Sequence, residues 1–296
     1  MYVQIASSRR SMLTQSFQKG IALIQVLLLS AILSMMALHF TLSSRQQVNI
    51  ANDLQDKIQA EVEMRTLESE VLFSLLTLSR NELKKSERQN NPIAVNWNFF
   101  GKPFKVGSNA TVSFQDVNGM LSLYGAAYKE QLERLLLQFG LSSQEVKFIV
   151  LNLYHWQGLS TDSNTKNSKV RGDYLINVAE LKSIAGIDNN LYEKLAPLVT
   201  TLQNVLFNPM TAPLPLLKVV IPADIAQEVE RLRQEGVLTK QRFTELTQIV
   251  EDESITFAPG RRQFINMNVK VGHSIVTRHL IVYIRPENQF PIVWFQ

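Results

Sequence analysis

The feature that most constrains this chain is an uncharged, strongly apolar stretch close to its start. No residue from Gly20 to Ser44 carries a formal charge, and the apolar run continues to about Leu42. More than about 20 residues, each rising 1.5 Å along a helix, span the roughly 30 Å hydrocarbon core of a bilayer. The sequence therefore predicts a membrane-spanning helix, with the rest of the chain as a body attached to it.

The remainder has the composition of a folded protein. Of the 296 residues, 45% are hydrophobic and 19% are charged, which is enough apolar material for a real core. The net charge is only +4 and the Lys and Arg residues are scattered, so no basic patch predicts nucleic-acid binding. The absence of cysteine excludes disulfides, thiolate zinc sites and cysteine nucleophiles.

The residues before the apolar stretch predict its orientation. Residues 1–20 contain Arg9, Arg10 and Lys19 and no acidic residue, so the N-terminus is expected to stay in the cytoplasm while the rest crosses the membrane. A secretory signal peptide fits poorly, because the apolar run is long and no small-residue cleavage pattern clearly ends it. An uncleaved anchor is the other simple interpretation.

The residues at the start of the apolar stretch resemble those of a known family. Lys19-Gly20 followed by the apolar residues 21–28 resembles a class III, prepilin-type leader. The resemblance implies cleavage by prepilin peptidase between Gly20 and Ile21, with the apolar segment kept in the mature protein. Ordinary pilins carry a glutamate at the fifth mature position, which here is Gln25. A subunit without that glutamate resembles the K-type minor pseudopilin of type II secretion and would have no subunit above it to pair with.

The helix is expected to extend well beyond the membrane. No Pro or Gly occurs between Ile21 and Pro92, so one helix from Ile21 to about Arg80, roughly 90 Å long, is predicted. Apolar residues at three- to five-residue spacing predict an amphipathic face that packs on the body. These residues are Val48, Leu54, Ile58, Val62, Leu67, Val71, Leu75 and Leu78.

After a polar linker, the body alternates between strand and helix patterns. Short strand-like runs surround the turn signal Asp116-Val117-Asn118-Gly119, and residues 120–124 are expected to form a further strand. Helical patterns follow, with Gly140 as a predicted stop and a capping box at residues 142–145. From residue 265 to 295 the period-two pattern predicts a three-stranded antiparallel meander, in which His273 and His279 are solvent-facing rather than ligands.

Residues 175–197 have the outline of a helix-hairpin-helix around Gly186. Such a turn can bind a DNA phosphate through its amides. Only Lys182 and Lys194 are near it, however, and Asp188 stands where a phosphate would approach, so a structural hairpin is favoured. K-type pseudopilins carry a SAM-like helical domain with this outline.

The loop 158–173 contains the one group of residues that resembles a metal site. Asp162, Asn164 and Asp173 are oxygen ligands of the kind calcium takes, but calcium needs six to eight oxygens. Some members of the family bind calcium here through acidic residues near a Trp-containing segment. Those acids are missing around Trp156, so we predict no metal and no cofactor.

Together these patterns predict an α+β fold with a long N-terminal transmembrane helix, a pilin-like antiparallel sheet and a large inserted all-α region. The expected divisions are a leader (1–20), the transmembrane half of the helix (21–42), its periplasmic half and linker (43–90), strands (91–127), the helical insertion (128–250) and final strands (251–296).

The resemblance implies a minor pseudopilin of the type II secretion system, anchored by a single pass in the bacterial inner membrane with a periplasmic body. Its implied partners are the I and J minor pseudopilins at the pseudopilus tip, with the major pseudopilin as a further candidate. The alternative is a minor pilin of a type IV pilus or competence filament that contacts surfaces or DNA. No catalytic motif stands out, so we predict no enzyme and no nucleic-acid partner.

Overall fold

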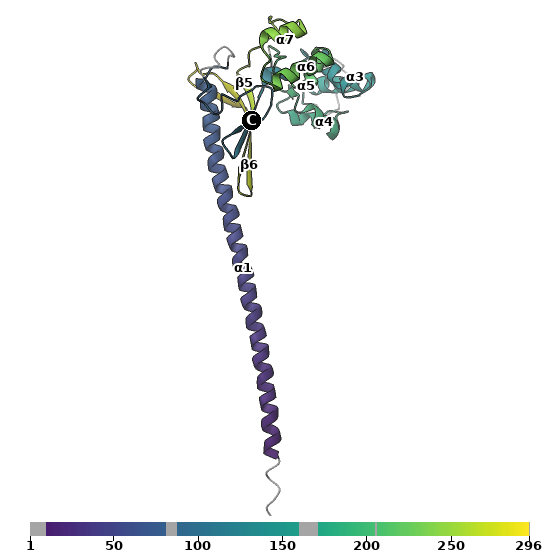
Figure 1. The fold of residues 1–296 in the computed structure, drawn as a ribbon. Helices are drawn as coiled ribbons and strands as arrows, with labels where there is room; N and C mark the ends of the chain where they lie inside the picture. Colours follow the sequence, from purple (N-terminus) through teal and green to yellow (C-terminus); the bar gives the residue numbers. More distant parts are fainter. Residues whose placement is uncertain (1–9, 81–87, 160–170, 205, 296) are drawn as a thin grey trace, which may run out of the picture. The chain divides into compact units, whose positions relative to one another are not determined.

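A computed structural model describes residues 10–80, 88–159, 171–204 and 206–295, with the backbone alone for residues 10–21. Its longest element is the helix α1, Arg10–Thr77 (Figure 1). The helix begins before the expected start at Ile21, so Gly20 is accommodated inside it, at a typical cost of about 1 kcal/mol relative to alanine. The chain forms two compact units, one of residues 1–59 with 271–274 and the other of residues 60–270 with 275–296.

The main sheet has five strands in the order β1-β2-β5-β6-β7. Strand β2 pairs antiparallel with β5, which places Phe114 opposite Ile265 although the whole helical region separates them in sequence. The meander predicted for residues 265–295 is confirmed as β5, β6 and β7. The strands are β1 Phe104–Val106, β2 Ala110–Asp116, β5 Arg262–Val271, β6 Ser274–Ile284 and β7 Ile292–Phe295.

The sheet has one buried face and one open face. Along β5, Ile265, Met267 and Val269 are fully buried, while Asn266 and Asn268 between them are exposed, as period-two alternation requires. The end of α1 buries a matching apolar face, and Figure 1 shows this end of the helix close to β5. The buried residues are Ala60, Met64, Leu67, Val71 and Leu75.

A helical region lies between β2 and β5 in the chain. The predicted stop at Gly140 is confirmed, since this glycine follows the end of α2 with φ +90°, and Ser142 and Glu145 form the predicted capping box. The α-helices are α2 Lys129–Gln138, α3 Ser143–Trp156, α4 Asn189–Leu195, α5 Leu214–Val220, α6 Ala223–Gln234 and α7 Lys240–Thr247, with 3-10 turns η2 Val117–Gly119 and η4 Val178–Ser183.

One strand lies in a different sheet from the one expected. The strand after the Asp116 turn, β3 Leu121–Ser122, pairs in parallel with β4 Val199–Thr200 in a separate two-stranded sheet. Leu121 and Val199 are both buried in the core of the helical region. The segment therefore belongs to the packing of the helical region rather than to the main sheet.

Candidate membrane and assembly site

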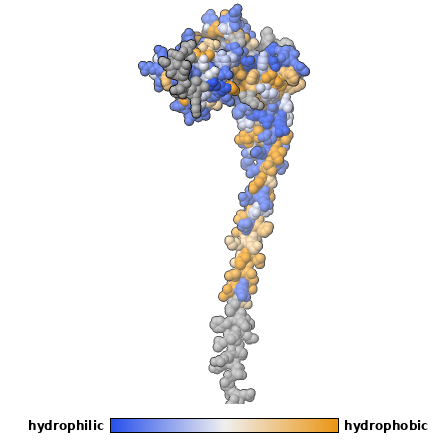
Figure 2. Space-filling model, turned by 180° about the vertical axis from the view of Figure 1, so that it is seen from behind, coloured by the Kyte–Doolittle hydropathy of each residue, from blue (hydrophilic) through white to orange (hydrophobic). Residues whose placement is uncertain are grey.

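The N-terminal part of α1 is apolar on every side and exposed. Every side chain from residue 22 to residue 42 is exposed in the isolated chain. On the face shown in Figure 2, apolar residues make up most of this part of the helix. The helix is long and apolar enough to cross a membrane. A helix that is hydrophobic all round is stable only in apolar surroundings, so this segment fits a membrane anchor.

The predicted processing and pairing residues lie at the start of this surface. Gly20 and Ile21 fall in the backbone-only part of α1, so the cleavage site stays a prediction. Gln25 is exposed on the helix among leucine and isoleucine side chains. Its neutral amide can donate and accept hydrogen bonds but cannot form the ion pair that a carboxylate would make.

Beyond residue 42, the prediction of a single amphipathic face along the helix is wrong. Leu54, Ile58 and Val62 are more than half exposed, whereas Leu67 and Val71 are buried. Each residue advances about 100° around a helix, so residues 13 positions apart, such as 54 and 67, lie well away from each other around it. The helix thus has a buried apolar face near its end and a second, exposed apolar face before it.

A charged side chain fixes the end of α1 to the sheet. Arg278 on β6 hydrogen-bonds to Glu68 on α1, and its other terminal nitrogen lies 3.3 Å from Glu61 Oε2. Arg278 is 30% exposed and Glu68 is 19% exposed, so the pair is largely shielded from water. Sequence reasoning missed this contact. The signal was an arginine at an inward-facing position of β6, between Val276 and Leu280.

Earlier along the helix, the β5–β6 turn fits against Asp56. The backbone N–H of His273 donates to Asp56 Oδ2 at 3.2 Å. A Cβ on Gly272, which has φ +53°, would lie 1.9 Å from the same oxygen. Glycine is therefore required here by both the backbone conformation and the close approach. The ring of the second predicted strand histidine, His279, contacts Asn266 Oδ1 at 2.6 Å on the open face.

The Asp116 turn joins the sheet to the helical region through a buried polar cluster. Asp116 is fully buried and accepts hydrogen bonds from the Asn118 N–H (3.1 Å), the Thr211 hydroxyl (3.1 Å) and the Asn208 amide (3.2 Å). The backbone N–H of Gly260 also donates to it, and burial raises the pKa of Asp116 to about 6 despite these hydrogen bonds. The sequence indicated a turn here, but it could not indicate the partners, which come from two distant segments.

The loop 158–173, for which no metal is predicted, is only partly described. Asp162 and Asn164 lie outside the described residues, and the Asp173 carboxylate accepts a hydrogen bond from the next backbone N–H in the chain. At the loop's end, Glu180 binds Arg171 at 2.7 Å and accepts from Trp156 Nε1 at 3.2 Å. Within the described ranges, no group of three or more His, Cys, Asp or Glu could hold a metal.

The helix-hairpin-helix outline corresponds to the 3-10 turn η4 followed by α4. A Cβ on Gly186 (φ +95°) would lie 2.8 Å from Ile149 Cγ1, so this glycine is required for packing on α3. Asp188 caps α4 by accepting the Leu191 N–H at 2.7 Å, and Lys182 lies over the Tyr192 ring. The carboxylate thus occupies the helix start, where a phosphate would have to bind.

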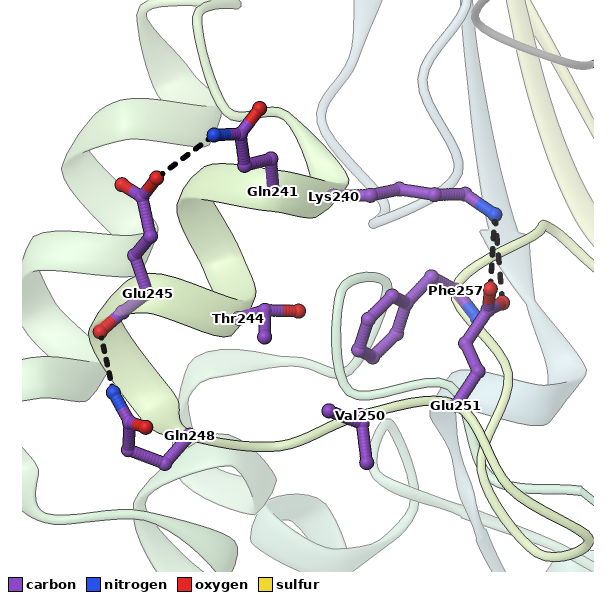
Figure 3. Close-up of a pocket in the computed structure, with 8 residues that line it drawn as sticks. All are labelled: Lys240, Gln241, Thr244, Glu245, Gln248, Val250, Glu251 and Phe257. Carbon is purple, nitrogen blue, oxygen red and sulfur yellow. Dashed lines mark hydrogen bonds and ion pairs between the residues drawn. The ribbon is translucent and has the colours of Figure 1, made fainter.

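A wide, open depression of about 630 Å³ lies beside α7 (Figure 3). Lys240 and Glu251 face each other across one side of it with Nζ and Oε1 3.4 Å apart, and Phe257 forms part of the wall. Gln248 has φ +59°, a left-handed conformation that ends α7. The lining contains no serine, cysteine or histidine, so this depression offers neither a nucleophile of those types nor an imidazole base.

Comparison with known proteins supports the fold. No known family and no curated protein matches the sequence. Among solved structures, a chain of the GspK-GspI-GspJ complex from the enterotoxigenic Escherichia coli type 2 secretion system matches with a TM-score of 0.54. The match is 14% identical and covers 83% of this chain and 97% of that chain. The predicted α+β fold, with a long apolar helix and an antiparallel sheet, is therefore confirmed. So is a resemblance, at the level of the fold, to a chain of this secretion complex.

Proposed function

We propose that this chain is a minor pseudopilin of the type II secretion system, of the K type, which helps to initiate or cap the pseudopilus. The observation that carries the proposal is the likeness of its fold to a chain of the GspK-GspI-GspJ complex. The neighbour is a secretion-system component, so the alternative of a type IV pilus or competence filament subunit is not favoured.

In this proposal the N-terminal segment is processed and then anchors the chain in the membrane. The prepilin peptidase removes residues 1–20, and the new N-terminus at Ile21 begins an apolar helix that stays in the inner membrane with the body in the periplasm. The exposure of this segment in the isolated chain supports such an anchor, because its apolar surface needs lipid or neighbouring helices around it.

The tip position follows from Gln25 and from the helical region. A carboxylate buried among helices is costly unless it is paired, and a subunit with no neighbour above it has no partner for one. Gln25 avoids that cost. The helical region α2–α7 makes the body bulky, which suits a subunit on which no further subunit stacks. The role is non-enzymatic in this proposal.

The partners in this proposal are the I and J minor pseudopilins. The test is co-expression of the full chain with candidate I and J subunits, extraction in neutral detergent and affinity purification through a tag on J. Recovery of all three proteins in one size-exclusion peak supports the proposal. A chain that elutes alone while I and J stay together would contradict the tip assignment.

A further inference from the structure

The β7 side of the main sheet is an edge without a charged residue, and no described strand other than β6 pairs with it. β7 pairs with β6 through Ile281–Phe295 and Ile284–Ile292, and no backbone hydrogen bond links it to any other described element. Its residues, Ile292 to Phe295, are all apolar, and Trp294 is 46% exposed. An apolar edge with free backbone groups is a template for pairing with another chain.

The opposite edge shows how this sheet protects a strand that stays unpaired. β1 has only three residues, its middle residue is the exposed Lys105, and Pro103 precedes it. A short strand, a lysine and a nearby proline are common ways of blocking edge pairing. β7 is also short and follows Pro291, but it contains no charged residue, so the two edges of the sheet differ in charge.

Two arginines that form no ion pair with a described residue lie beside β7 on the open face of the sheet. The Arg262 guanidinium lies 5.2 Å from the Tyr283 ring centre and 6.0 Å from that of Phe295, and Arg285 lies 5.0 Å from the Tyr283 ring centre. Neither Arg262 nor Arg285 forms an ion pair within the described ranges. Arg262 donates to the Gln203 carbonyl oxygen, and Glu287 bonds to Arg261. The pKa of Glu287 is lowered chiefly by a hydrogen bond from its own backbone N–H, and the charge of Arg285 also contributes.

We propose that the β7 edge binds an extended acidic segment of a partner protein by β-strand addition. Side chains of an added strand alternate between the two faces of the sheet. On the open face its carboxylates lie near Arg262 and Arg285, and on the other face its apolar side chains lie next to Ile292 and Trp294. A second copy of this chain is a poor occupant, because pairing two β7 strands would bring two sets of unpaired arginines to one face.

The test uses the full chain in neutral detergent and a fluorescent peptide of about eight residues that alternates glutamate and valine. We expect anisotropy to show binding that weakens as salt is raised, because the arginine–carboxylate contacts are exposed. A lysine–valine peptide, and a glutamate–valine peptide N-methylated at alternate amides, should not bind. Equal binding of the acidic and basic peptides, or of the methylated one, would overturn the proposal.

Variants locate the site. The double variant Arg262→Gln/Arg285→Gln should bind the acidic peptide about tenfold more weakly, and Lys105→Gln at the other edge should bind it unchanged. Unchanged affinity of the double variant for the acidic peptide would refute the assignment. In the variant Trp294→Cys, a disulfide between two copies that forms even in the presence of the peptide would also refute it.

If the double variant does not fold, hydrogen exchange on the unmodified chain shows where the peptide binds. The peptide should protect those amides of residues 292–295 that do not already bond to β6, and it should leave the amides of residues 104–106 unchanged. Lack of new protection at 292–295 would sink the proposal. The probe needs no pseudopilin subunit, so failure here leaves the proposed tip function standing.

Discussion

The buried Asp116 cluster makes the stability of the body depend on pH in an unusual direction. Most paired carboxylates have lowered pKa values in the folded state and lose stabilisation in acid. Burial instead raises the pKa of Asp116 from its usual 3.8 to about 6. The folded state therefore holds this proton more tightly than the unfolded chain, and the stability that Asp116 contributes falls as the pH rises through that range.

The size of the effect follows from the difference between the two pKa values. A difference of about two pH units, at about 1.4 kcal/mol each, gives a full effect of about 3 kcal/mol. Of this, about 2 kcal/mol should be lost between about pH 4.5 and pH 7, because the unfolded carboxyl is already mostly ionised at the lower value. Above about pH 7 the contribution should be flat.

Other carboxylates titrate at lower pH with the opposite sign, and they add their own pH dependence to that of Asp116. The pKa of Glu251, for example, is lowered, chiefly by the hydrogen bond that it accepts from the Phe257 N–H. The assay must therefore compare the wild type with Asp116→Asn, by denaturant unfolding of the full chain in detergent, followed by tryptophan fluorescence. The free energy of unfolding of the wild type relative to the variant should fall by about 2 kcal/mol from about pH 4.5 to pH 7. A difference that is constant, or that rises with pH, would refute the reasoning.

The contacts described above lead to four further predictions. Gly186→Ala should lower the free energy of unfolding by about 3 kcal/mol, because the new methyl group clashes with α3. Gly140 has a similar φ but open space around it, so Gly140→Ala should lower the free energy of unfolding by only about 1 kcal/mol. Arg278→Met should cost about 2 kcal/mol in the same unfolding assay, since it leaves Glu68, which is 19% exposed, without its arginine. Gly20→Val should abolish processing, so mass spectrometry should find the leader still attached, while the wild type begins at Ile21 when prepilin peptidase is present. Gln25→Glu should insert normally and keep secretion, measured by the export of a secreted enzyme, and loss of export would contradict the cap interpretation.

Local signals in the sequence predicted much of the fold. The breaker-free run predicted α1, the capping box at Ser142 predicted the start of α3, and the period-two pattern predicted the final meander. These features depend on residues close together in the chain. The processing site stays a prediction, because the side chains around Gly20 lie outside the described residues. The predicted divisions of the chain also stay predictions.

The long-range contacts could not be predicted in the same way. The carboxylate of Asp116 meets Thr211 and the Gly260 amide, which are far away in sequence, and Arg278 finds its glutamates on a helix some 210 residues earlier. A single sequence gives no measure of such proximity. The second apolar face of α1 was also missed. Spacings of three to five residues each turn the chain by a different angle, so a run of them drifts from one side of the helix to another.

The proposed function requires a single copy of this chain in the tip complex rather than many copies along a filament. Native mass spectrometry of the complex released from detergent after co-expression with candidate I and J subunits measures this directly. The proposed function predicts one mass, equal to one copy each of the three processed proteins. A ladder of masses with several copies of this chain, or the chain alone, would contradict it.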